Sequence, residues 1–199
     1  MVFNTQFNQP AVKHREGPDF DPHDNIDIVN IVVSSALEKD IPLERMAATL
    51  PNTEYNPESF PGLVLKFRKP KTSALIFSSG KIVCTGAKNF DQVRESLTKI
   101  VEAVSKIDIA VEIEPEINVQ NIVASGKIGA DINLNVLAMN LDNTEYEPEQ
   151  FPGLVYKLDK AQATFLLFSN GKIVCTGTKS EEMVHKSIDL LMENLDNVE

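Results

Sequence analysis

The side chains of this sequence whose types and spacing could do chemistry are mostly basic, and they gather in two segments. Residues 63–88 contain six basic residues and no acidic one, although the whole chain carries a formal net charge of −10. Residues 154–179 contain four lysines and one acid, Asp159. Basic side chains around an apolar surface are typical of proteins that hold a nucleic acid through its groove and contact its phosphates. The alternative is that lysines at strand edges only prevent aggregation.

Groups that could act in catalysis or bind a metal have no partners at suitable spacing. Cys84 and Cys175 both lie in IVCTG segments, without a second cysteine or a histidine at metal spacing, so we expect buried, free thiols. His14, His23 and His185 have no ligand or catalytic partner near them in the sequence, and we expect them on the surface. The sequence also has no phosphate-binding glycine motif. We therefore expect neither an enzyme nor a bound metal or cofactor.

The two basic segments belong to two copies of one longer segment. Residues 52–88 return as residues 143–179, 91 positions later and without a gap, and 24 of the 37 pairs are identical. So strict a register predicts that both copies adopt the same fold. One copy is small for an independent core, so we expect two subdomains that together form one domain.

The repeat divides the chain into four parts. Residues 26–107 are the first repeat, residues 108–115 an acidic linker, and residues 116–199 the second repeat with an acidic carboxyl end. Residues 1–25 stand outside the repeat, contain three prolines and show little periodicity, so they predict a mobile N-terminal arm. No apolar run approaches the roughly 18 residues of a membrane span, and we expect a soluble, intracellular protein.

Each copy predicts short strands and two helices. Residues 29–33 form a β-branched run, and residues 43–50 have the apolar spacing of a helix. The segments LVLKF, SALIF and KIVCTG predict three strands, whose short connections favour antiparallel pairing. A long helix is expected to follow, with an apolar stripe from Phe90 onward and Asn89 as its N-cap; Ser180 opens the counterpart in the second copy.

These strands are apolar on both faces, yet two helices per copy can cover only one face. The second face therefore predicts a binding surface for something outside the chain. A nucleic acid would satisfy this requirement. A protein- or ligand-binding scaffold that uses the same face without recognising DNA is the alternative, and it predicts dimers or a partner but no bending of DNA.

The paired FPGLV and GKIVCTG motifs, the Asn-Ile-Val that opens a strand in each copy, and the direct repeat resemble the TATA-box-binding protein family, in its archaeal type. The resemblance covers essentially the whole chain after about residue 26. That family is itself a standard example of minor-groove binding, in which apolar wedges kink the duplex. The resemblance implies an α+β fold, a pseudo-twofold saddle with a curved antiparallel ten-stranded sheet and four helices on its convex face. It also implies a general transcription factor that binds the A·T-rich TATA element and nucleates the initiation complex.

The resemblance implies roles for individual residues. The phenylalanines expected to insert between base steps are Phe60, Phe77, Phe151 and Phe168. Asn30 and Asn121 match asparagines that donate to minor-groove acceptors of the central base pairs. The rest of the minor-groove floor is matched by Val32, Val123, Leu75, Leu166, Val83, Val174, Thr85 and Thr176. The positions expected near phosphates are Lys66, Lys71, Lys81, Lys88, Lys157, Lys172 and Lys179.

The two halves differ in the basic pattern, because Gln162 stands at the position of Lys71 and Asp159 at that of Arg68. Unequal phosphate contacts by the two halves are therefore expected.

Partners and location follow from the same resemblance. The loop with Glu147, Glu149 and Gln150 matches the loop that engages transcription factor B in the family, and the RNA polymerase machinery would be reached indirectly. The free protein could form a homodimer through its concave face. We expect a cytoplasmic, nucleoid-associated protein if the host is archaeal, and a nuclear one if it is eukaryotic.

Overall fold

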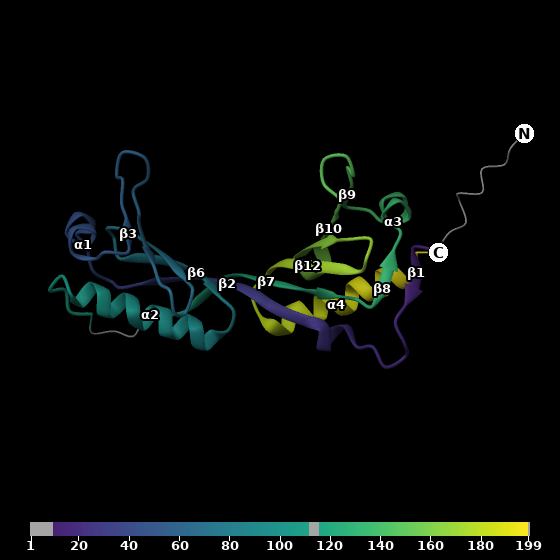
Figure 1. Cartoon of the computed structure of the whole chain (residues 1–199), viewed down its shortest axis with the longest axis horizontal. Helices are drawn as coiled ribbons and strands as arrows, with labels where there is room; N and C mark the ends of the chain where they lie inside the picture. The colour runs from purple at the N-terminus through teal and green to yellow at the C-terminus, as the bar shows by residue number, and fades with distance from the viewer. Residues whose placement is uncertain (1–9, 112–115, 199) are drawn as a thin grey trace, which may run out of the picture. The chain divides into compact units, whose positions relative to one another are not determined.

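The computed structural model describes residues 10–111 and 116–198, and these residues form two compact units. The first-repeat unit lies within residues 29–121. The second-repeat unit combines residues 10–28 with residues 122–198, so the N-terminal residues belong with the second repeat. Within the described residues, each unit provides five strands of its main antiparallel sheet and two α-helices, and the second-repeat unit adds a separate two-stranded sheet (Figure 1).

The sheet of the first-repeat unit is antiparallel throughout. Its strands follow the order β3 (Thr53–Glu54), β4 (Leu63–Lys66), β5 (Ser73–Ile76), β6 (Lys81–Ala87) and β2 (Ile26–Ala36). The helices of this unit are α1 (Leu43–Thr49) and α2 (Phe90–Ser105). In Figure 1, α2 runs beneath the strands while the loop between β3 and β4 stands out on the opposite side.

The second-repeat unit has the same plan. Its strands follow the order β9 (Thr144–Glu145), β10 (Leu154–Leu158), β11 (Ala163–Leu167), β12 (Lys172–Thr178) and β7 (Asn118–Lys127). Its helices are α3 (Leu134–Asn140), α4 (Glu181–Asp196) and a short 3₁₀ turn, η3 (Asp159–Ala161). The repeat in the sequence is therefore a repeat in structure.

The long helices begin and pack as the sequence predicted. The Asn89 side chain accepts a hydrogen bond from Gln92 N (2.9 Å), and Ser180 Oγ accepts one from Met183 N (3.1 Å), so each helix has a side-chain N-cap. The apolar stripe of α2 buries Val93, Leu97, Ile100 and Val104, and that of α4 buries Val184, Ile188, Leu191 and Leu195. Among the described residues, no helix is long and apolar enough to cross a membrane.

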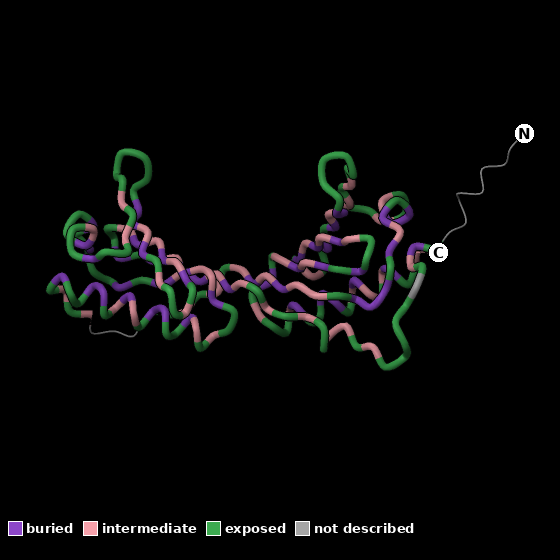
Figure 2. The backbone as a smooth tube through the Cα atoms, viewed as in Figure 1, coloured by how far each residue is buried: buried purple, intermediate pink, exposed green. Residues whose placement is uncertain are grey.

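Burial alternates along the strands although polarity does not. On β2, Ile31, Val33 and Ser35 are buried, whereas Asn30 and Val32 are only half-buried. Figure 2 shows this alternation as purple and pink segments of the strands, with the projecting loops green. Since the helices cover the buried side, each unit presents a second, half-exposed sheet face. We call this face, which carries Asn30 and Val32 on β2, the open face.

Residues 10–25 differ from the expected mobile arm, whereas residues 1–9 of that arm lie outside the described residues. Residues 10–25 pack on the second-repeat unit: β1 (Val12–Arg15) pairs antiparallel with β8 (Ala130–Ile132), and Ala11 is fully buried. Ala11 O accepts a hydrogen bond from Asn133 N (2.7 Å). A short 3₁₀ turn, η2 (Pro22–Asn25), leads into β2. A four-residue strand and a few apolar contacts produce no periodicity in the sequence, which is why composition alone suggested an unstructured arm.

Candidate nucleic-acid interface

The open face of each unit carries a row of apolar side chains in cross-strand register. In the first-repeat unit, Val64 lies opposite Leu75, and Leu75 lies opposite Val83. In the second-repeat unit, the same row consists of Val155, Leu166 and Val174. All six are half-buried, while their neighbours along each strand are buried under the helices. These rows therefore form an apolar floor that keeps some exposure to solvent.

Polar side chains continue the open face beside this floor. Thr85 lies opposite Ser73, and Ser73 lies opposite Lys66. The matching row in the second-repeat unit is Thr176, Thr164 and Lys157. Val32 and Val123, which follow the two asparagines by two positions, are half-buried on the same strands as those asparagines. The face thus combines apolar contact with hydroxyl groups and ends in a lysine.

Asn30 is held in one orientation by its neighbours on β6. Its Oδ1 accepts hydrogen bonds from Gly86 N (2.7 Å) and Thr85 Oγ1 (3.2 Å). Gly86 can present its N–H in this way because it has a φ of +100° in an irregularity of the β2–β6 ladder. Since the oxygen is occupied by donors, the amide NH₂ remains as the donating end of the side chain. Asn121 is half-buried at the matching position of β7, where Gly177 repeats the positive φ at +97°.

Each unit holds a pair of phenylalanines at one end of its open face. Phe60 and Phe77 lie with ring centroids 6.0 Å apart at 62°, and Phe151 and Phe168 lie 5.9 Å apart at 69°. Phe60 is 43% exposed and Phe151 40%, which is unusual for rings of this size. An edge-to-face pair of this kind holds the exposed ring in a defined orientation.

A glycine two residues after each exposed ring makes room for the pair. A Cβ on Gly62 would lie 2.7 Å from Phe60 Cε1 and 3.2 Å from Phe77 Cε1. On Gly153 it would lie 2.7 Å from Phe151 Cε1 and 3.0 Å from Phe168 Cε1. The Phe-Pro-Gly motif therefore fixes both rings through a close approach of backbone and aromatic edge.

The projecting loops that lead to these rings close in the same way. Asn56 O accepts hydrogen bonds from Ser59 N (3.1 Å) and Phe60 N (3.0 Å), and Glu147 O accepts from Gln150 N and Phe151 N (both 2.9 Å). Glu147, Glu149 and Gln150, the residues expected to contact a protein partner, are all exposed. Each loop thus fixes the position of a phenylalanine on one side and exposes a polar surface on the other.

The lysines expected near phosphates fall into two groups. Lys66 Nζ donates to Glu54 Oε1 (2.5 Å) and Lys157 Nζ to Glu145 Oε1 (2.8 Å), so both are already in ion pairs with the short outer strands. Hydrogen bonding and charge attraction within the second pair lower the pKa of Glu145 and raise that of Lys157. The other lysines are exposed near the ends of strands β5, β6 and β12: Lys71, Lys81, Lys88, Lys172 and Lys179.

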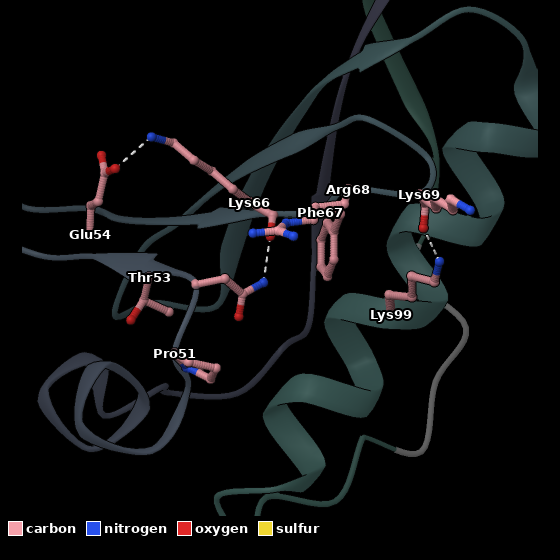
Figure 3. A pocket seen from close by; sticks show the side chains of 9 residues that line it. Pro51, Thr53, Glu54, Lys66, Phe67, Arg68, Lys69 and Lys99 are labelled. Carbon is pink, nitrogen blue, oxygen red and sulfur yellow. Dashed lines mark hydrogen bonds and ion pairs between the residues drawn. The ribbon is translucent and has the colours of Figure 1, made fainter.

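Figure 3 shows a hollow beside the Lys66–Glu54 pair, between the end of β4 and α2. Asn52 donates to the Lys66 carbonyl there, and Lys99 donates to the Lys69 carbonyl. The second-repeat unit does not repeat the basic character of this hollow, since Asp159 stands at the position of Arg68 and accepts from Asn143 Nδ2 (3.0 Å). The expected difference between the halves is thus a difference in local charge at this end of the sheet.

Sequence reasoning missed several side chains of the open face. Val64 and Val155 lie in the apolar rows, and Ser73 and Thr164 in the polar ones. The strand register identifies these residues, because each of them lies directly opposite a residue that was expected in the minor-groove floor. The two cysteines, by contrast, are buried and free as expected.

Three comparisons place these features among known proteins. The family model described as transcription factor TFIID, or TATA-binding protein, matches residues 25–107 and 116–198. The TATA-box-binding protein of Haloarcula marismortui is 47% identical over 180 residues, which cover 89% of this chain and 97% of that protein. That of Methanothermobacter thermautotrophicus is 51% identical over 158 residues, covering 79% and 87%. A solved structure, Methanococcus jannaschii TBP, superimposes with a TM-score of 0.83 at 44% identity, covering 87% of this chain and 99% of that one.

Proposed function

Because the chain belongs to the TATA-binding protein family, we infer that it is a sequence-specific general transcription factor that binds the TATA element and nucleates the initiation complex. The predicted family and the predicted fold of two repeats, ten antiparallel strands and four helices are confirmed. One observation carries the assignment to the open face. In both units, an apolar floor that no helix of the described residues covers ends in a partly exposed phenylalanine pair.

The floor suits the minor groove of A·T pairs. That groove presents adenine N3 and thymine O2 acceptors, and guanine adds an N2 amino group that protrudes into it. An apolar floor of valines and leucines cannot hydrogen-bond this amino group, so a G·C pair would leave a donor unpaired. Asn30, with its oxygen occupied and its NH₂ free to donate, suits an acceptor in the groove.

The phenylalanine pairs would supply the kinks. A ring inserted between two base pairs unstacks them at a cost of about a few kcal/mol, which is offset by the protein surface that bent DNA can contact. The arrangement of Phe60 and Phe151 supports this role, since each ring is exposed before any ligand is bound.

A duplex with inosine·cytosine pairs tests whether the protein recognises the minor groove or the major groove. Inosine·cytosine pairs lack the N2 amino group, so their minor groove resembles that of A·T pairs while their major groove resembles that of G·C pairs. Fluorescence anisotropy should give similar affinities for the TATA duplex and its inosine·cytosine version, and weak binding to a G·C version. Equal affinity for all three duplexes would show that the protein binds DNA without sequence specificity, which would contradict the proposal. A strong preference for the A·T duplex over the inosine·cytosine duplex would show that the protein recognises bases through the major groove.

The protein partners belong to the same proposal. The exposed acidic loop with Glu147 and Glu149 suits a basic surface of transcription factor B, through which the polymerase machinery would be recruited. Glu149→Lys should weaken capture of that factor on a TATA duplex, and Glu58→Lys, at the matching position of the first loop, is the control. Loss with both variants, or with neither, would contradict the assignment.

With DNA as its ligand, the protein would lie at the chromosome, in the cytoplasm of an archaeal host.

The apolar floor also supports self-association when no DNA is present. A homodimer through the open face should dissociate when a TATA duplex is added, which sedimentation velocity can follow. A dimer that persists on DNA would place the contact elsewhere.

A further inference from the structure

A cluster of two histidines and an aspartate lies on the second-repeat unit, away from the open-face residues described above. His23 belongs to the N-terminal residues, in η2, whereas His185 and Asp189 lie one turn apart on α4. His23 Nδ1 is 2.8 Å from His185 Nδ1, and His23 Nε2 is 2.8 Å from Asp189 Oδ1. The ring centroids are 4.9 Å apart, with an angle of 46° between the rings. None of these side chains has a role in the proposed DNA contacts.

The position of His23 is fixed by its own segment. Asp21 Oδ1 accepts from His23 N (2.8 Å), and Asn25 Nδ2 donates to Asp21 O (2.9 Å), so the turn that carries the ring is closed by side chains. The carboxylate of Asp189 holds the proton on Nε2 of His23. The lone pair on His23 Nδ1 is then directed at His185, whose Nδ1 donates the proton of this hydrogen bond. A metal ion would take the place of that proton, with His185 in the tautomer that carries its proton on Nε2. A carboxylate behind a histidine is the usual arrangement that orients an imidazole toward a metal.

We propose that His23 and His185 bind a divalent transition metal of the zinc class, with Asp189 as a positioning residue for His23. Two nitrogens bound tetrahedrally at about 2.0–2.1 Å lie about 3.3 Å apart, so the two rings need to separate by only about 0.5 Å to admit the ion. Imidazole nitrogens suit zinc, copper and nickel, whereas magnesium and calcium prefer oxygen.

The site is open and has two protein ligands. Over residues 10–111 and 116–198, no group of three or more histidine, cysteine, aspartate and glutamate side chains could hold a metal ion. Water would therefore complete the coordination sphere, and the ion would exchange readily and be removed by a chelator. His23 is 30% exposed and Asp189 67%, which leaves the ion access from solvent.

Metal binding would link the N-terminal segment to α4. That segment is otherwise held by the β1–β8 ladder and by the ion pair of Arg15 with Asp196. In the first-repeat unit, Arg94 stands at the position of His185 and Thr98 at that of Asp189, so the first repeat does not carry the same ligands. The ion would strengthen the second-repeat unit alone.

Thermal unfolding of the untagged, full-length protein in zinc chloride tests the proposal. Zinc should raise the melting temperature by a few degrees, EDTA should reverse the rise, and magnesium chloride should give none. Titration calorimetry should give one zinc per chain. His23→Gln and His185→Gln should each abolish the rise, and Asp189→Asn should weaken zinc binding about 10- to 100-fold.

The remaining histidine provides the matched control, since His14→Gln should respond to zinc like the unaltered protein. Circular dichroism of each variant without metal establishes that it is folded. Absence of a zinc response in the unaltered protein would overturn the proposal. So would a response that survives in His23→Gln and His185→Gln, because zinc would then bind at another site.

Discussion

At the scale of single residues, the exposed phenylalanines depend on the glycines that follow them. Gly62 has no positive φ, so its backbone would accept an alanine. The restriction comes from the side chain, because a Cβ would lie 2.7 Å from the Phe60 ring. Glycine is therefore required for the position of the Phe60 ring and not for the conformation of the turn.

Gly62→Ala should displace the Phe60–Phe77 pair while leaving the fold intact. We expect a loss in affinity for a TATA duplex of about 1–2 kcal/mol, or roughly five- to thirtyfold, measured by fluorescence anisotropy. Gly17→Ala is the control, since nothing lies within 4 Å of a Cβ there. Unchanged affinity in Gly62→Ala would mean that the ring position does not matter for binding.

Because the two thiols are buried, the free energy of unfolding is expected to decrease at alkaline pH. Burial raises the pKa of Cys175 from 9.0 to about 12, and burial also raises the pKa of Cys84. The folded protein favours the protonated thiol, so this contribution to the free energy of unfolding is complete below about pH 9. It is lost as the pH rises toward 12.

Urea unfolding between pH 8 and pH 11 should therefore show falling stability, and the fall should be shallower in Cys175→Ala. Ellman's reagent at pH 8 should react with both cysteines in urea and with neither in the native protein. Rapid reaction of the native protein would show that the thiols are accessible.

At the scale of elements, the short outer strands β3 and β9 each hold a lysine through a carboxylate. The Lys157–Glu145 and Lys66–Glu54 pairs occupy ammonium groups at the positions expected near phosphates. Both partners are largely exposed, so the pairs add little to stability, and in the proposed complex they would compete with DNA for the lysine.

Glu145→Gln should therefore strengthen DNA binding at low salt. Freeing Lys157 for a phosphate should steepen the slope of log K against log salt by up to about 0.9. Glu149→Gln removes the same charge without releasing a paired lysine and is the control. A similar change with both variants would indicate a general charge effect instead of a specific lysine contact.

The sequence predicted the helices and strands more completely than the strand register and the contacts between residues far apart in the chain. The helix of Phe90–Ser105 and its cap at Asn89 followed from local periodicity, and strands β2, β4, β5 and β6 followed from their apolar runs. Val64 was missed because its neighbours Leu63 and Leu65 are also apolar, and only the register shows which of the three lies on the open face. The His23–His185 contact joins residues 162 positions apart, which no spacing rule could bring together.

At the scale of the whole molecule, the duplication is not perfect. The N-terminal segment packs on the second-repeat unit, and the basic residues are denser in the first. A net charge of −10 would by itself repel DNA, so approach depends on the basic strand segments and should be strongly dependent on salt.

Ala11→Asp tests whether the N-terminal segment contributes to stability without contributing to binding. It places a charge at a fully buried position, so the melting temperature should fall by several degrees, about 2–4 °C for each kcal/mol. DNA bending measured below the transition should be unchanged. Pro10→Asp, at the exposed neighbouring position, should have little effect on either quantity. A loss of bending in Ala11→Asp would connect the segment to the open face.

The most direct test of the open face as a DNA-kinking surface is the bend angle of a TATA duplex, measured by resonance energy transfer between its labelled ends. Phe60→Ala and Phe151→Ala should each reduce the bend, and the double variant should nearly abolish it, with folding verified by circular dichroism. Met139→Ala, which removes a side chain that is 65% exposed on α3, should bend DNA normally. A full bend in the double variant would contradict the account.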